Sequence, residues 1–120
     1  MSRKKKTVIK VLYWKECPSW GLALERVNKI AEEIKSKGEK DVEVVLEEIK
    51  TDEEASAKKF PGSPTILVNG KDIDEEGAKQ NPIGLTCRVY YINGKYLPIP
   101  PYEFIKERIL KIIEEQTYKL

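Results

Sequence analysis

The first 49 residues constrain the fold of this chain more than any other part. Residues 8–14 (VIKVLYW) and 42–49 (VEVVLEEI) are rich in β-branched residues, which predicts two strands. Between them, apolar residues recur three and four positions apart from Trp20 to Ile34, which predicts an amphipathic helix that ends near Gly38. Two strands joined through a helix form a parallel, right-handed crossover within one sheet. The chain therefore begins as an α/β fold.

The next part of the chain predicts a short helix and a hairpin. Thr51 and Glu54 have the spacing of a capping box, so a helix is expected to run to about Lys59. Residues 65–68 (TILV) and the following KDI segment flank Asn69-Gly70, a pair typical of a two-residue hairpin turn. These two strands are therefore antiparallel.

Beyond the hairpin, residues 74–86 are polar and are expected to be irregular, and residues 87–97 (CRVYYINGKYL) predict another extended pair. A proline-rich stretch then leads into a last helix, whose inner face carries Ile105, Ile109, Ile112 and Ile113. The expected architecture is α/β with a mixed four-stranded sheet (β-α-β-α-β-β-α), helices on both faces, and an extra irregular or extended segment before the C-terminal helix.

Composition and charge fit one globular domain. The chain has 120 residues, of which 40% are hydrophobic and 35% charged. We expect residues 1–7, which carry a basic run, to form a disordered tail and residues 8–120 to form a single domain. A net charge of +2 gives no reason to expect nucleic acid or a membrane as a partner, and no apolar run approaches the ~20 residues of a membrane span. A cytoplasmic location is expected.

The residue types limit the available chemistry. The chain has no histidine, which excludes Ser–His and Cys–His nucleophile pairs and imidazole metal sites, and two cysteines cannot form a four-cysteine zinc or iron–sulfur site. Two cysteines can form one disulfide or hold one soft metal ion, so no organic cofactor or dedicated metal site is expected. Abundant lysine and glutamate point to a heat-adapted source, in which intracellular disulfides occur.

Two stretches carry a resemblance to known proteins. Cys17 follows the first strand at the start of the first helix, and GSPT precedes the third strand. The order of elements, with these two stretches in these places, resembles that of proteins with the thioredoxin fold. The SPTILVNGKDI stretch is similar to the corresponding stretch of glutaredoxins. The resemblance implies that Pro64 is a cis-proline that lies beside the active cysteine, with Ser63 before it. In such proteins the backbone before the proline pairs with an extended substrate.

Over about 110 residues, the chain is also similar to small uncharacterised thioredoxin-like proteins with a single CP cysteine, a GSPTI..NG.D stretch and a CRVY stretch. Here these are Cys17-Pro18, residues 62–72 and residues 87–90. Some of those proteins are labelled alkylmercury lyases, but this chain lacks the further cysteines that such an enzyme requires.

Cys17 is the candidate nucleophile. At a helix N-terminus, with Pro18 as the first helical residue, free N–H groups and the helix dipole favour the thiolate. A dithiol site of the thioredoxin type would hold a second cysteine where this chain has Trp20. Ser63, Pro64, Thr65 and Trp20 are the candidate substrate-binding residues.

Three interpretations of Cys87 remain open. It resolves the mixed disulfide formed by Cys17, with Arg88 lowering the pKa of its thiol. Alternatively, Cys17 works alone with an external thiol, as in monothiol glutaredoxins, or Cys87 only packs. Disulfide formation requires that the two Cα atoms lie within ~7 Å.

The favoured function is therefore thiol–disulfide redox chemistry on a protein or small-molecule disulfide, with a reductase of the thioredoxin-reductase type as recycling partner. The alternatives are a protein that binds a soft metal ion such as mercuric or cuprous ion, and a redox-inactive scaffold that binds a partner. The sequence does not specify an oligomeric state.

Overall fold

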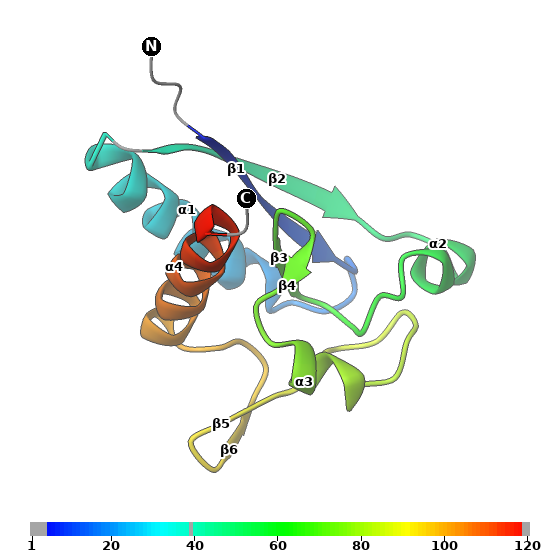
Figure 1. Cartoon of the computed structure of the whole chain (residues 1–120). Helices are drawn as coiled ribbons and strands as arrows, with labels where there is room; N and C mark the ends of the chain where they lie inside the picture. Colours follow the sequence, from blue (N-terminus) through cyan, green and yellow to red (C-terminus); the bar gives the residue numbers. More distant parts are fainter. Residues whose placement is uncertain (1–4, 39, 119–120) are drawn as a thin grey trace.

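The structure is a computed structural model and describes residues 5–38 and 40–118. Its main sheet has the strand order β2-β1-β3-β4 (Figure 1). β1 (Lys5–Tyr13) pairs in parallel with β2 (Lys40–Glu48). β3 (Thr65–Val68) is antiparallel to β1, and β4 (Lys71–Asp72) is antiparallel to β3. The predicted α/β fold with a mixed four-stranded sheet is confirmed, and its arrangement is thioredoxin-like.

Four helices and a second hairpin complete the fold. The helices are α1 (Trp20–Ser36), α2 (Asp52–Ala57), α3 (Glu75–Lys79) and α4 (Tyr102–Tyr118). The predicted extended pair is the hairpin of β5 (Tyr90–Ile92) and β6 (Lys95–Leu97), which forms a separate two-stranded sheet. None of the helices in the described part of the chain is long and apolar enough to cross a membrane.

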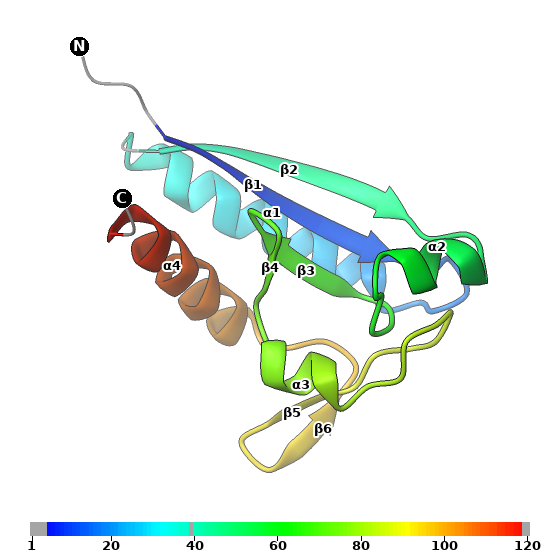
Figure 2. The ribbon, with the colours of Figure 1, turned by 45° about the vertical axis from the view of Figure 1, so that its right-hand side comes forward.

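Helices α1 and α4 lie side by side on one face of the main sheet (Figure 2). Alternation along the strands directs one set of side chains to this face, where they are removed from water with the apolar faces of the two helices. The fully buried members of this core are Ile9, Val11, Val27, Ile30, Ile66, Val68, Ile73, Ile105 and Ile109.

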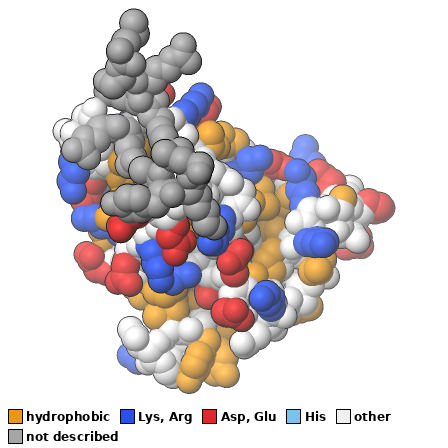
Figure 3. All heavy atoms as spheres, in the orientation of Figure 1, with side chains coloured by type: hydrophobic (Ala, Val, Ile, Leu, Met, Phe, Trp, Pro, Cys, Tyr) orange, Lys and Arg blue, Asp and Glu red, His pale blue; other side chains and the backbone are white. Residues whose placement is uncertain are grey.

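The prediction of helices on both faces is confirmed, but the opposite face is less covered than the first. Among the described helices, only α2 packs there, in a small cluster formed by Leu12, Ile49, Ala55 and Phe60. Because α2 has six residues, it covers only the end of the sheet. Farther along this face, Glu47 pairs with Lys10 and with Lys58. In the view of Figure 3, acidic and basic side chains are interspersed over the surface.

Two stretches differ from the sequence predictions. Residues 5–7, expected in a disordered tail, belong to β1, because Thr7 is buried and pairs with Val42 of β2. Residues 1–4 of that tail lie outside the described residues. Residues 74–86 are not wholly irregular: they contain α3, whose first turn is capped by the Asp74 carboxylate, which accepts a hydrogen bond from the Gly77 N–H.

Candidate functional site

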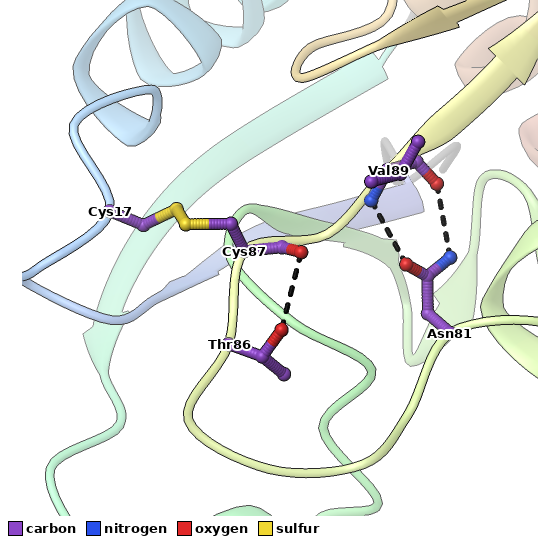
Figure 4. Close-up of a disulfide and its surroundings, with 5 residues drawn as sticks. All are labelled: Cys17, Asn81, Thr86, Cys87 and Val89. Carbon is purple, nitrogen blue, oxygen red and sulfur yellow. Dashed lines mark hydrogen bonds between the residues drawn. A yellow bond between two sulfur atoms is a disulfide. The ribbon is translucent and has the colours of Figure 1, made fainter.

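The two cysteines of the chain are joined by a disulfide (Figure 4). Cys17 lies in the loop that leads from β1 into α1, and Cys87 lies 70 residues away in the segment before β5. Their Cα atoms are 5.7 Å apart, within the range that a disulfide requires. Of the three interpretations of Cys87, the structure therefore shows the one in which its sulfur meets that of Cys17.

Cys17 is the buried residue of a loop whose neighbouring residues are exposed. The Cys17 N–H donates a hydrogen bond to the Trp14 carbonyl oxygen, and Cys17 is only 2% exposed. Trp20, expected as a substrate contact, is half-buried and stacks on Tyr13, with ring centroids 4.3 Å apart. Its ring is therefore part of the packing around the loop.

The start of α1 lies later than predicted. The helix begins at Trp20 with Ser19 as its N-cap, so Pro18 is an exposed loop residue and is not the first helical residue. Cys17 consequently precedes the N-cap by two positions. Because the effect of the helix dipole declines over about one turn, this position weakens the expected tuning of the Cys17 thiol by the helix and Pro18.

Cys87 is held beside Ser63 through the backbone. The two residues form a parallel β-bridge: the Ser63 N–H donates to the Thr86 carbonyl oxygen at 2.8 Å, and the Arg88 N–H donates to the Ser63 carbonyl oxygen at 2.9 Å. The Ser63–Pro64 peptide bond is cis. The backbone edge that the resemblance assigns to an extended substrate is thus occupied by the chain's own residues 86–88. Ser63, Pro64 and Thr65 are buried in this structure and do not present a free surface.

Arg88 has a different position from the one predicted. Its side chain is 1% exposed and forms a bidentate ion pair with Asp72, with distances of 2.7 and 3.0 Å. The same guanidinium donates to the Thr65 hydroxyl and the Asp74 carbonyl oxygen. Because neighbouring side chains of an extended segment point to opposite sides, Arg88 faces inward while Cys87 is exposed. Arg88 therefore anchors the segment, and its charge is balanced by Asp72 rather than directed at the Cys87 thiol.

Tyr90 and Asn81 also hold the cysteine-bearing segment in place. The Tyr90 hydroxyl donates to the Pro64 carbonyl oxygen at 2.6 Å, and the Arg88 guanidinium lies 4.4 Å from the centre of the Tyr90 ring. Burial raises the pKa of Tyr90, which keeps its hydroxyl protonated as a donor. On the exposed side, the Asn81 side chain exchanges two hydrogen bonds with the Val89 backbone (Figure 4).

Asp72, Tyr90 and Asn81 were not among the predicted site residues. One signal was available for Tyr90: alternation in the CRVY stretch places Arg88 and Tyr90 on one side and Cys87 and Val89 on the other. A buried arginine on the inner side also requires an acidic partner. The sequence offers many carboxylates, however, and the hairpin geometry that selects Asp72 is a tertiary feature.

Fold and site together define a class: an α/β protein of thioredoxin-like fold with one intramolecular disulfide beside its cis-proline loop, an arrangement suited to redox-type chemistry. The chain belongs to the family described as Domain of unknown function (DUF2703), whose family model matches residues 9–109. This range includes both cysteines and Pro64. No curated protein gives a match to the chain.

Proposed function

We propose that this protein is a thiol–disulfide redox protein whose working couple is Cys17 and Cys87. The observation that carries this proposal is the way in which the two cysteines are positioned. Cys17 is held by its loop, and Cys87 is held by backbone pairing to Ser63 and by the Arg88–Asp72 ion pair. None of these contacts includes the sulfur–sulfur bond, so they can persist when it is reduced.

Such positioning favours a reversible couple. When one of the two cysteines carries a mixed disulfide, the thiolate of the other lies close to it at a high effective concentration. It attacks the sulfur of that cysteine, the substrate sulfur leaves as a thiolate, and the mixed disulfide is resolved within the molecule. The oxidised protein accepts two electrons and two protons from two substrate thiols, which leave as a disulfide, and the reduced protein carries out the reverse. The proposed partners are a protein or small-molecule disulfide and a reductase that regenerates the dithiol.

Redox cycling of the folded protein tests this proposal. The protein is reduced, freed of reductant, exposed to a mild disulfide oxidant, and analysed by intact mass and peptide mapping. The expected result is a reversible mass difference of about 2 Da that maps to the Cys17–Cys87 bridge. Cys17→Ser and Cys87→Ser serve as controls that lack the change. A bridge that is reduced only after unfolding, or that does not re-form, would make the disulfide a structural one and contradict the proposal.

The same preparation separates the two alternatives. A soft-metal protein would bind one mercuric or cuprous ion per pair of reduced thiols, tightly enough to prevent re-formation of the bridge by the oxidant. A redox-inactive scaffold would show a bridge that does not cycle under any of these conditions. Either outcome would replace redox cycling as the leading function.

A further inference from the structure

The two sulfur-bearing residues differ in their access to solvent. Cys17 is 2% exposed, whereas Cys87 belongs to the exposed residues. An attacking thiolate must reach the sulfur atom that it attacks, so access is one of the factors that decide which half of a disulfide reacts. This difference does not agree with the order expected from the sequence. In that order Cys17 reacts with the substrate and Cys87 resolves the mixed disulfide.

The two segments that carry the cysteines are held by contacts that lie outside the disulfide. The loop of Cys17 is closed by the hydrogen bond from the Cys17 N–H to the Trp14 carbonyl oxygen. Across from it, the segment formed by residues 86–88 is fixed to Ser63 by two backbone hydrogen bonds and is anchored through the buried Arg88. Cleavage of the disulfide removes none of these contacts, so Cys17 is expected to stay covered in the dithiol form.

The same segment also limits the kind of substrate. A polypeptide that binds by strand addition needs unpaired backbone groups at an edge. Both backbone groups of Ser63 are already paired, with Thr86 and with Arg88. To bind there, a polypeptide would have to displace a segment that is held by a bidentate ion pair and by the Tyr90–Pro64 hydrogen bond.

We propose, building on the redox function above, that Cys87 is the residue that exchanges with the external partner and that Cys17 is the internal leaving and resolving thiol. The partner is a low-molecular-weight thiol or disulfide rather than an extended polypeptide.

The thiolate of the small thiol attacks the sulfur of Cys87. The Cys17–Cys87 bond breaks, its electron pair leaves on the Cys17 sulfur, and a mixed disulfide forms on Cys87. A second thiolate attacks the small-molecule sulfur of this mixed disulfide, releases the small disulfide and leaves Cys87 as a thiolate. In the reverse direction, the Cys87 thiolate attacks one sulfur of a small disulfide, the other small sulfur leaves as a thiolate, and a mixed disulfide forms on Cys87. The Cys17 thiolate then attacks the Cys87 sulfur, the bound small thiol leaves as a thiolate, and the Cys17–Cys87 bond forms.

Trapping of the mixed disulfide in the wild-type protein identifies the reacting sulfur. The oxidised protein is treated briefly with 2-mercaptoethanol and quenched with acid and an alkylating agent. Peptide mapping then locates the adduct. The expected result is an adduct on Cys87 and an alkylated Cys17. An adduct mainly on Cys17 would overturn the assignment.

Single-cysteine variants give an independent measurement. Reduced Cys17→Ser retains Cys87, and reduced Cys87→Ser retains Cys17; each is mixed with hydroxyethyl disulfide and followed by intact mass. Because Cys17 is buried, Cys87 is expected to react about tenfold faster or more in the folded proteins, and the two rates should converge in denaturant. Equal rates in the folded proteins, or a faster Cys17, would overturn the assignment.

A separate experiment tests the proposed class of substrate by comparing a small thiol with a peptide thiol. Oxidised wild-type protein is reduced by 2-mercaptoethanol and, separately, by an unstructured peptide with one central cysteine, at equal thiolate concentration. The peptide is expected to react no faster than the small thiol. A peptide rate about tenfold higher would show that the peptide gains from binding beside Ser63, and would overturn this part of the proposal. A bridge that fails to cycle at all defeats the proposed function, whereas cycling through Cys17 defeats only the present inference.

Discussion

Arg88 connects the cysteine segment to the rest of the protein. In the part of the chain that the structure describes, Arg88 is the one buried charged residue. The two terminal nitrogens of its guanidinium donate to Asp72, Thr65 and the Asp74 carbonyl oxygen, whereas its Nε has no hydrogen-bond partner among the described residues. A buried charge is tolerated only when it is paired and hydrogen-bonded, so these partners are required once Arg88 faces inward. The ion pair thereby fixes the register of residues 86–88 against Ser63.

We therefore expect Arg88→Met to destabilise the protein strongly. Removal of one partner of a buried pair leaves the other charge without compensation, with an expected loss of about 3 kcal/mol in the free energy of unfolding. Urea unfolding of the reduced protein measures this loss. The matched control is Lys106→Met, which breaks the more exposed pair with Glu33 and should cost about 1 kcal/mol or less. Equal losses in the two variants would contradict an anchoring role for Arg88.

Ser63 and Thr65 offer a contrast between two buried hydroxyls. The Ser63 hydroxyl has no hydrogen-bond partner among the described residues, whereas the Thr65 hydroxyl donates to the Gly62 carbonyl oxygen and accepts from Arg88. Ser63→Ala should leave the free energy of unfolding unchanged or raise it by up to about 1 kcal/mol. Thr65→Val should lower it by about 1–3 kcal/mol, because a donor of Arg88 loses its acceptor. Denaturant unfolding measures both, and a larger loss in Ser63→Ala than in Thr65→Val would contradict this account.

At the scale of elements, the position of the segment formed by residues 86–88 depends on close backbone approach at Gly62. Gly62 has a φ of +111°, and a Cβ atom there would lie 2.8 Å from the Arg88 nitrogen and 2.9 Å from its Cα. Contacts this short with backbone atoms cannot be relieved by a side-chain rotation. Glycine at this position is therefore a condition for docking the Cys87 segment on Ser63.

Gly62→Ala is expected to displace the segment formed by residues 86–88. Re-formation of the Cys17–Cys87 bridge after reduction should slow by about tenfold or more, because the effective concentration of the two thiols falls. Gly70→Ala is the matched control: its φ of +88° carries similar backbone strain, but a Cβ there meets nothing within 4 Å. Stopped samples analysed by intact mass give the two rates. If both variants re-form the bridge at the wild-type rate, the close approach has no role in positioning Cys87.

On the face of the sheet that α2 covers only at one end, Glu47 of β2 forms ion pairs with Lys10 and Lys58 whose strength depends on pH. A hydrogen bond from Lys58 lowers the pKa of the Glu47 carboxyl, partial burial opposes this effect, and Lys10 adds to the lowering. Because the folded pKa lies below the ordinary value of 4.5, the stabilisation is complete above that value and is lost as the pH falls through the folded pKa.

Glu47→Gln should consequently reduce the free energy of unfolding at neutral pH by about 1 kcal/mol or less, and the difference from wild type should vanish in acid, below the folded pKa. Urea unfolding at about pH 7 and about pH 2 tests the sign. A difference that grows toward low pH would contradict the assignment of the lowered pKa to Glu47.

At the scale of the whole molecule, the disulfide joins the amino-terminal βαβ unit to the segment that precedes the last helix. The closed loop spans 70 residues, and a link of this length restricts the unfolded chain far more than the folded one. Loop-closure entropy predicts a stabilisation of about 4 kcal/mol for the oxidised protein.

The reduced protein should remain folded while it loses this amount of stability. Chemical unfolding with and without reductant measures the difference, and Cys87→Ser under reductant is the control that should match the reduced wild type. Unfolding on reduction alone would show that the disulfide, rather than the Arg88 and Ser63 contacts, holds the two segments together, and would also contradict a reversible redox couple.

Much of the fold follows from local patterns in the sequence. The β-branched content of residues 8–14 and 42–49, the helical spacing from Trp20 to Ile34, and the Asn69-Gly70 turn are properties of neighbouring residues. For this reason β1, β2, α1 and the β3–β4 hairpin could be predicted. The residue types also limited the site to the two cysteines, because the chain has no histidine.

Only the tertiary structure decided how distant parts meet. Three features of the site depend on the docking of the segment that carries Cys87, which is separated from Cys17 by 70 residues. They are the contact between Cys87 and Cys17, the choice of Asp72 as the partner of Arg88, and the pairing of the Ser63 backbone. Such docking is selected by the burial and pairing of many groups at once, and no local pattern contains that selection. For this reason the sequence by itself determined the elements and the candidate chemistry, and the tertiary structure determined which groups meet and which of the two cysteines is exposed.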